Sequence, residues 1–389
     1  MENLYKILII DLANKEHNVE YIDTNISNFY MGGYGLALYW LNNNRDYSNP
    51  WMIFTSSIID YSNPINKYII MAKDNSYRLS YANMGGDFSD FLKSNDYDGL
   101  VLVNKANEFL DIYIETDEIS YKKAYLDDDY SNTYRFNNLK KEYGDDISSL
   151  YITDSTIRGD KISRLINDKY RGCSKSLPNI LFDKNIGSIT IKYNKKREIY
   201  EAPFYLENSN RRCSDCIMGC YSKKSSKKSS IFSKNDSYNT DDMQKLNKII
   251  NRLDEYGIDI FALSKSIEFS YTYLNHIYDF KSLNIDQIDY ISKNIVKKDR
   301  PSLYKDLAQG RGYLEKKYNI NPSNDKKTSS KSSDYMKIID SAGICLFALN
   351  PKNLTNIVET INKAYGQNYS QAQLVELINK IEKMQRNLS

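Results

Sequence analysis

The chain has few of the residues and segments that mark several classes of protein. It contains only two histidines and five cysteines in 389 residues, and no stretch approaches the ~20 apolar residues that span a bilayer. A formal net charge of +3 is too small to indicate binding to nucleic acid or to an anionic membrane. The segment Met1 to Lys6 carries an acid and lacks the apolar core of a signal peptide. We therefore expect a cytoplasmic protein that binds neither nucleic acid nor a membrane.

The remaining composition is that of an ordinary globular protein. Hydrophobic residues make up 41% of the chain and charged residues 26%. Its length is sufficient for two or three domains. Because disulfides are rare in the cytoplasm, clustered cysteines in such a chain more often bind metal.

Strand-length apolar or alternating runs dominate the first two hundred residues. We predict strands at 6–12, 18–22, 51–54, 67–72, 99–103, 110–115 and 188–193. Two helices are expected in this part, at 36–42 and around 161–168. The first two strands flank a polar turn, which predicts an opening hairpin.

The pattern changes to helical periodicity after Arg211. Helices are predicted at 243–253, 261–278, 353–365 and 371–384, separated by polar stretches at 222–239 and 321–334 that are expected to be loops. The fold class is therefore α+β, with a β-rich N-terminal domain followed by two mainly helical domains. The expected divisions are 1–208, 209–322 and 335–389.

Four of the five cysteines have a spacing suited to an iron–sulfur cluster. Cys213, Cys216 and Cys220 form a C-x2-C-x3-C group, and Cys345 lies far downstream. Three thiolates on one tight loop and a fourth from a distant segment can hold a [4Fe–4S] cubane. Cys173 has no cysteine nearby and is interpreted as a small buried hydrophobic residue.

Structural zinc is the competing interpretation of the cluster. Zinc sites favour paired C-x2-C elements or cysteines accompanied by histidines. Here His17 and His276 are both distant from the cysteines, and there is no second C-x2-C. The spacing favours iron–sulfur over zinc, and leaves both open.

The cysteine segments resemble those of the tungsten-dependent aldehyde ferredoxin oxidoreductases. The run 213–220 is similar to the family's C-x2-C-P-x2-C element, with Ile217 in place of proline. The run 340–347, D-S-A-G-I-C-L-F, resembles D-S-x-G-L-C-x-F, which carries the fourth cluster ligand. A sister motif, D-x-x-G-L-D, matches D-E-Y-G-I-D at 254–259.

The N-terminal half carries further likenesses to this family. The run 29–37, F-Y-M-G-G-Y-G-L-A, resembles F-L-G-G-R-G-L-A, and 96–106 resembles G-Y-D-A-I-V-V-E-G-K-A. The run 82–88, A-N-M-G-G-D-F, resembles A-N-S-G-G-x-F, in which the asparagine carbonyl helps to position magnesium between pterin phosphates. Lys67 aligns with an arginine that bridges pterin and cluster, and a lysine there keeps the charge but not the planar fork.

The resemblance implies both a set of cofactors and a site. The cofactors are one [4Fe–4S] cluster on the four cysteines and a tungsten or molybdenum bis-pterin, with magnesium as a further ion. It implies oxidation of an aldehyde-type substrate, with electrons passed through the cluster to ferredoxin, and it allows a homodimer. The implied cofactor-binding residues are Lys67, Asn83, Gly85, Gly86, Asp254, Asp259, Asp340 and Ile344.

These residue types suit the chemistry. Paired glycines let backbone amides approach an anionic ligand, and carboxylates such as Asp254 and Asp340 accept hydrogen bonds from amino groups of a pterin ring. Singly, each also fits an ordinary role: Asp254 as a helix-surface acid, and Gly257 as a residue that ends a helix. Their double occurrence, once beside a cluster cysteine, favours binding.

Several family segments are missing. No counterpart is recognisable of the segments that carry the family's active-site glutamate and catalytic histidine, and its A-A-G-R-G-G run is reduced to G-C-S-K-S-L at 172–177, where Lys175 retains a charge. The sequence therefore names no catalytic residue. Three functions remain: an oxidoreductase, a catalytically degenerate relative that acts in electron transfer or assembly, and a zinc-stabilised interaction protein.

Overall fold

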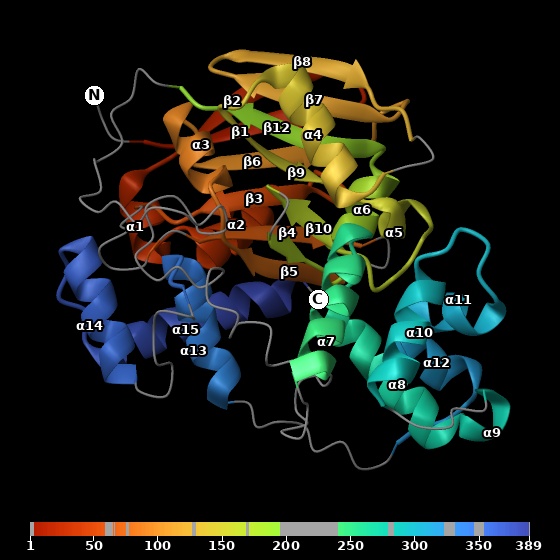
Figure 1. The fold of residues 1–389 in the computed structure, drawn as a ribbon. Coiled ribbons are helices and arrows are strands. Elements are labelled where there is room, and N and C mark those ends of the chain that lie inside the picture. Colours follow the sequence, from red (N-terminus) through yellow and green to blue (C-terminus); the bar gives the residue numbers. More distant parts are fainter. Residues whose placement is uncertain are drawn as a thin grey trace.

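Two β-sheets fill the N-terminal half of the chain, and helices follow them (Figure 1). The computed structural model describes residues 4–58, 65, 67–74, 78–126, 130–168, 171–194, 240–278, 284–322, 331–345 and 354–388. The predicted fold class, a β-rich N-terminal domain followed by helices, is confirmed.

The first sheet has six strands in the order β2-β1-β6-β3-β4-β5. The strands are β1 (Tyr5–Asp11), β2 (Glu16–Ile22), β3 (Trp51–Thr55), β4 (Tyr68–Lys73), β5 (Leu79–Met84) and β6 (Gly99–Val103). The β1–β6 pair is parallel and the others are antiparallel. Every residue of β3 and β6 is buried, so these strands are continuous apolar runs rather than alternating ones.

The second sheet repeats this topology. Its order is β8-β7-β12-β9-β10-β11, with a parallel β7–β12 pair and antiparallel neighbours elsewhere. The strands are β7 (Leu110–Glu115), β8 (Glu118–Lys123), β9 (Ile147–Tyr151), β10 (Leu165–Asn167), β11 (Arg171–Cys173) and β12 (Ile186–Lys192). Each strand therefore has a partner at the same place in the first sheet.

The helices between strands follow the same duplication. A helix lies between the second and third strands of each half, α2 (Gly33–Asn43) and α4 (Asn132–Tyr143), and another between the fifth and sixth, α3 (Phe88–Ser94) and α6 (Leu177–Asp183). Two short helices, α1 (Thr24–Tyr30) and α5 (Asp154–Ile157), complete this part. The domain is therefore an internal structural repeat of about ninety residues, which the sequence did not reveal.

Six helices after the sheets share a core of their own. They are α7 (Thr240–Glu255), α8 (Ile260–Tyr273), α9 (Asn275–Tyr278), α10 (Ile285–Ile295), α11 (Ser302–Ala308) and α12 (Arg311–Lys317). Their core is built from residues such as Ile249, Leu253, Ile291 and Leu307, joined by Ile162 from the second sheet's half. Amphipathic periodicity therefore produces a separate helical unit.

The last three helices pack on the first sheet. They are α13 (Lys331–Ala342), α14 (Leu354–Tyr365) and α15 (Gln371–Asn387), and a capping box at Ser370 opens the last. Their residues Ile339, Ile361 and Ile381 lie in one core with Ile9 and Phe54 of the sheet. Figure 1 shows this group and the α7–α12 group side by side below the sheets.

Two local predictions were wrong. The segment predicted as a helix around 161–168 contains β10, which pairs with both β9 and β11. The polar stretch predicted as a loop at 321–334 ends within α13, which begins at Lys331. The prediction for Cys173 is confirmed, because its side chain is buried in the core of the second sheet.

Candidate functional site

The segment 340–345 is fixed against the start of β4. Helix α13 ends at Ala342, and Gly343 has a φ of +67°, a conformation that favours glycine. The amide of Ile344 donates to the carbonyl of Ile339 over 3.0 Å, and Ile344 forms an antiparallel bridge with Ile65. The amide of Lys67 donates to the carbonyl of Gly343 over 3.0 Å. Cys345 follows directly, with 4% of its surface exposed.

Asp340, in the last turn of α13, contacts the first sheet through its side chain. The side-chain amide of Asn83, on β5, donates to its Oδ1 over 2.7 Å. Burial raises the pKa of the Asp340 carboxyl to about 6, although the bond from Asn83 and the charge of Lys175 both act to lower it. Asn83 is the only hydrogen-bond donor to this carboxyl among the residues that the structure describes.

Lys67 lies over the glycine pair that follows β5. A Cβ on Gly85 would overlap the Lys67 ammonium, and Gly86 has a φ of +118°. Within the described part of the chain, no ion pair joins Lys67 to an acidic residue. The glycine therefore leaves room for a positive charge at the backbone.

The second acidic loop, 254–259, has the same backbone pattern. Gly257 has a φ of +66°, and the amide of Ile258 donates to the carbonyl of Leu253 over 2.9 Å. Ile258 bridges Ser163, and the amide of Arg164 donates to the carbonyl of Gly257 over 2.8 Å. Each D-x-x-G loop is thus attached to the residues just before a strand, β4 for the first loop and β10 for the second.

The carboxylates of this second loop have protein partners. Arg164 Nη1 donates to Asp254 Oδ1 over 2.7 Å. Asp259 accepts from the amide of Ala262 over 2.9 Å, which caps α8, and from the Ser174 hydroxyl over 2.5 Å. Asp254 is therefore in an ion pair and Asp259 accepts two hydrogen bonds, whereas Asp340 accepts one hydrogen bond from an amide side chain among the described residues.

The connection after β11 brings the two loops to one region. Ser174 binds Asp259, while the charge of the adjacent Lys175 acts on Asp340. The Lys175 ammonium also lies 4.8 Å from the centre of the Tyr81 ring, and Tyr81 is on β5 two residues before Asn83. The residues after β11, in the second sheet, therefore interact with both acidic loops and with β5 of the first sheet.

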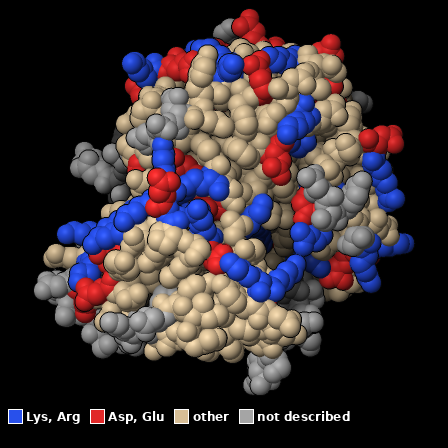
Figure 2. Space-filling model, turned by 90° about the vertical axis from the view of Figure 1, so that its right-hand side faces the viewer, with Lys and Arg blue, Asp and Glu red and all other residues tan. Residues whose placement is uncertain are grey.

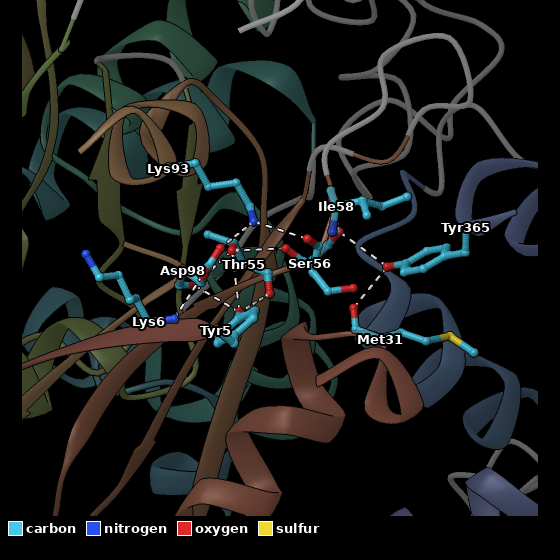
Figure 3. A network of polar contacts seen from close by, with 10 residues as sticks. Tyr5, Lys6, Met31, Thr55, Ser56, Ile58, Lys93, Asp98 and Tyr365 are labelled. Carbon is cyan, nitrogen blue, oxygen red and sulfur yellow. Dashed lines mark hydrogen bonds and ion pairs between the residues drawn. The ribbon is translucent and has the colours of Figure 1, made fainter. Parts of the chain in front are cut away.

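A polar network holds the first loop from behind (Figure 3). The Tyr365 hydroxyl, at the end of α14, donates to the carbonyl of Met31 over 2.9 Å and lies 3.3 Å from that of Ala342. It also contacts the Ser56 hydroxyl after β3. In the same network, Lys93 donates to Asp98 over 2.6 Å. Through Tyr365, these contacts tie Ala342 to the residues that follow β3 in the first sheet.

The predicted site residues are only partly within the described chain. Cys213, Cys216 and Cys220 lie outside the described residues, while Cys345 is buried without a disulfide. Within the described ranges, no three His, Cys, Asp or Glu side chains are grouped so as to hold a metal ion. His17, on β2, and His276, on α9, are both exposed and belong to neither acidic loop.

Two residues of the site were missed from the sequence. Arg164 was assigned to a helix without a role, and Ser174 was noted only as part of a reduced glycine run. The signal that could have found them is their place beside the second D-x-x-G loop, which depends on the repeat of the sheets.

Figure 2 shows Lys and Arg side chains gathered around a hollow on one face of the molecule.

Comparisons with known proteins agree with this fold. Residues 7–193 match the family described as "Aldehyde ferredoxin oxidoreductase, N-terminal domain". This match spans just under half of the chain, and it shows that residues 7–193 are similar to the N-terminal domain of that oxidoreductase family, as the sequence motifs predicted.

A solved structure shares the fold. It is titled "Active site complex BamBC of Benzoyl Coenzyme A reductase in complex with 1,5 Dienoyl-CoA", with a TM-score of 0.70 and 12% sequence identity. The alignment covers 99% of this chain and 89% of that chain, and at this identity it shows a common fold alone. A search of curated protein sequences found no match. No helix in the described ranges is long and apolar enough to cross a membrane.

The pterin that the family implies fits the two loops unequally. Around the first loop lie a buried carboxyl with one hydrogen-bond donor among the described residues, an amide side chain, and an ammonium above a glycine. These groups suit a ligand with amino and phosphate groups. Around the second loop, Arg164 and Ser174 already occupy the carboxylates. The fit is therefore good at Lys67, Asn83 and Asp340.

Proposed function

We propose that the chain is an oxidoreductase of the aldehyde ferredoxin oxidoreductase type. It would hold a [4Fe–4S] cluster and a tungsten or molybdenum pterin, oxidise an aldehyde-type substrate, and pass electrons to ferredoxin. The observation that carries this proposal is the backbone bond from Lys67 to Gly343, which fixes a segment that carries both the buried Asp340 carboxyl and the buried Cys345 against the first sheet.

The cluster would be held by Cys213, Cys216, Cys220 and Cys345. Cys345 suits this role because it is buried at the end of a loop fixed by two backbone contacts, those of Lys67 and Ile65. A thiolate so placed couples cluster binding to the packing of α13 on the first sheet. Lys67 next to the cluster would favour its reduced form by placing a positive charge nearby.

The pterin would be bound by residues that come from both sides of the loop. Asp340 would accept hydrogen bonds from ring amino groups while Asn83 fixes its orientation. Ile344 is wholly buried in the core of the first sheet, so it would hold the loop in place beneath the ligand. Gly85 and Gly86 would let backbone amides approach the phosphate, with magnesium as its counter-ion. When bound, the metal supplies Lewis-acid and redox chemistry at the substrate oxygen.

The division 1–208, 209–322 and 335–389 is proposed with this function. The separate core of α7–α12 supports the middle unit, which carries Asp254 and Asp259. The helices α13–α15 share their core with the first sheet, and Asp340 lies on α13 while Cys345 follows it. The two acidic loops would thus approach the pterin site from different units.

The test is anaerobic purification of the full chain, with iron, sulfide, tungsten and molybdenum analysis, an absorption spectrum and a dye-linked aldehyde assay. Cys345→Ser should abolish the charge-transfer absorption, and Cys173→Ser is the matched control. Burial raises the pKa of the Cys173 thiol to about 12, so it should be inert and its removal should leave the spectrum intact. Zinc in place of iron, or loss of the spectrum in both variants, would contradict the cluster assignment.

A second candidate is a degenerate relative that transfers electrons or assists assembly. The observation that favours it is the absence of histidine from both acidic loops and their strand partners, in the part of the chain that the structure describes. Loss of positioned proton transfer costs on the order of 10²–10⁴-fold in rate. Protein with full metal and pterin content that turns over no aldehyde, yet exchanges electrons with ferredoxin, would favour this alternative.

A further inference from the structure

Equivalent residues flank the two acidic loops. In the first sheet Tyr68 lies opposite Met84 in the β4–β5 pair, and in the second Leu165 lies opposite Cys173 in the β10–β11 pair. Three residues then lead into a helix in both halves, 85–87 before α3 and 174–176 before α6. The equivalent pairs are therefore Lys67 with Arg164, Asn83 with Gly172, and Gly85 with Ser174.

The loops support this equivalence independently. The amide of Lys67 donates to the carbonyl of Gly343, and the amide of Arg164 donates to that of Gly257. Both glycines are in the left-handed region, with φ of +67° and +66°. Lys67 and Arg164 are thus the same residue of a duplicated unit, and the two halves can be compared position by position.

The first difference lies at the residue after the second strand of each hairpin. In the first half this residue is Gly85, and the Lys67 ammonium takes the space of the missing side chain. In the second half it is Ser174, whose hydroxyl donates to Asp259 over 2.5 Å. A side chain therefore stands where the cation of the first half lies.

The second difference lies two residues earlier. In the first half Asn83 reaches Asp340, whereas its equivalent Gly172 has no side chain. A Cβ on Gly172 would lie 2.8 Å from both Nε and Nη2 of Arg164, so the guanidinium fills this space. From there Arg164 pairs with Asp254 over 2.7 Å, and the two side chains are only 17% and 30% exposed.

The two differences leave opposite binding capacities. The first half keeps a cation without an acidic partner among the described residues, and a buried carboxyl with one donor. In the second half the cation and its carboxylate neutralise each other, and both oxygens of Asp259 accept protein hydrogen bonds. A ligand there would have to break a partly buried ion pair, which leaves charges desolvated and unpaired.

We propose that this chain binds a single pterin, in the first half at Lys67, Asn83 and Asp340, and that the second half is closed by the Arg164–Asp254 pair and the Ser174–Asp259 bond. The identity of the ligand rests on the proposed function. The family resemblance implies two pterins, one for each loop, so the inference is a departure of this chain from that pattern.

The first measurement is the molar ratio of pterin to tungsten plus molybdenum in the purified holoprotein, with pterin determined by the fluorescence of its oxidised form. Referring pterin to metal removes the effect of incomplete loading. A ratio of one is expected, and a ratio of two overturns the inference. Protein that contains metal or iron but no pterin overturns the proposed function and the ligand named here.

A matched pair of variants locates the ligand. Asp340→Asn and Asp254→Asn make the same chemical change at equivalent positions. Asp340→Asn should weaken pterin retention by about 10- to 100-fold, the loss expected for a hydrogen bond to a charged group. Asp254→Asn should leave the pterin-to-metal ratio unchanged. Equal losses in both variants, in protein whose circular dichroism is intact, would overturn the asymmetry.

A third measurement needs no cofactor. In the apo chain, the Tm changes of Arg164→Gln and Asp254→Asn should be strongly non-additive in the double variant, because they remove the same ion pair. Those of Lys67→Gln and Asp340→Asn should be additive. Coupling in the first half and none in the second would overturn the closure of the second half, whether or not any pterin is found.

Discussion

Asp340→Asn should stabilise the apo chain at neutral pH. Burial raises the pKa of this carboxyl from 3.8 to about 6, so the folded chain holds the proton more tightly than the unfolded chain does. As pH rises through this window, the unfolded chain ionises first and the free energy of unfolding falls. Asparagine keeps the shape and an acceptor for Asn83, and it removes this dependence.

The size of the effect follows from the shift. About two pH units at ~1.36 kcal/mol each make a cost of roughly 3 kcal/mol at pH 8, which falls to roughly 1.5 kcal/mol at pH 5. The free energy of unfolding of Asp340→Asn should exceed that of the parent chain by these amounts. Urea unfolding of both proteins between pH 5 and pH 8 measures the difference.

Asp289→Asn is a control of opposite sign. Burial acts to raise the pKa of Asp289, but hydrogen bonds from Lys293 and Arg252 outweigh it and lower the pKa below 3.8. This carboxylate stabilises the fold above pH 3.8, so its replacement should destabilise the chain by a nearly constant amount from pH 5 to pH 8. If Asp340→Asn also destabilised the chain by a nearly constant amount, then burial of the ionised Asp340 would not cost free energy. That result would refute the reasoning.

Three further variants test the surroundings of the two loops. Gly257→Ala should lower the free energy of unfolding by at least about 2 kcal/mol, because its Cβ would overlap Thr153 and its φ is +66°. Chemical denaturation measures this change, and an unchanged midpoint would contradict the left-handed turn. Tyr365→Phe should cost roughly 1–2 kcal/mol by removing the bond to Met31, and should speed hydrogen exchange in 340–345; Tyr369→Phe, whose hydroxyl has no hydrogen bond within the described chain, should do neither. Arg300→Ala should cost roughly 3–5 kcal/mol in thermal and urea unfolding, since it removes the bidentate partner of the fully buried Asp160, and a near-neutral result would exclude that ion pair.

Most of the fold could be predicted because its signals are local. Apolar runs such as 51–54 and 99–103 are long enough to indicate strands, and α7 and α14 bury one face at helical spacing. The run 161–168 failed because a short apolar segment fits a helix or a strand equally well. Its strand state depends on β9 and β11, which pair with it from elsewhere in the chain.

The site could be predicted only where a motif carries it. Asp340, Asn83 and Lys67 stand in recognisable segments, and the structure brings the side chains of the first two into contact. Arg164 could not be found in this way, because it reaches Asp254 across ninety residues by filling the space beside a glycine. That contact follows from the duplicated sheets, a repeat that the sequence did not reveal.

The shared core of the first sheet and the last helices has a consequence for biosynthesis. Ile9 and Phe54 belong to strands made early, whereas their partners Ile339, Ile361 and Ile381 lie near the end of the chain. At ~5–20 residues per second, the ribosome needs on the order of tens of seconds to make the segment between β5 and α13. During that time α2 is the described helix that covers this apolar face of the sheet, and the part that α13–α15 later bury stays open. Synthesis of α13–α15 is therefore the step that completes this core.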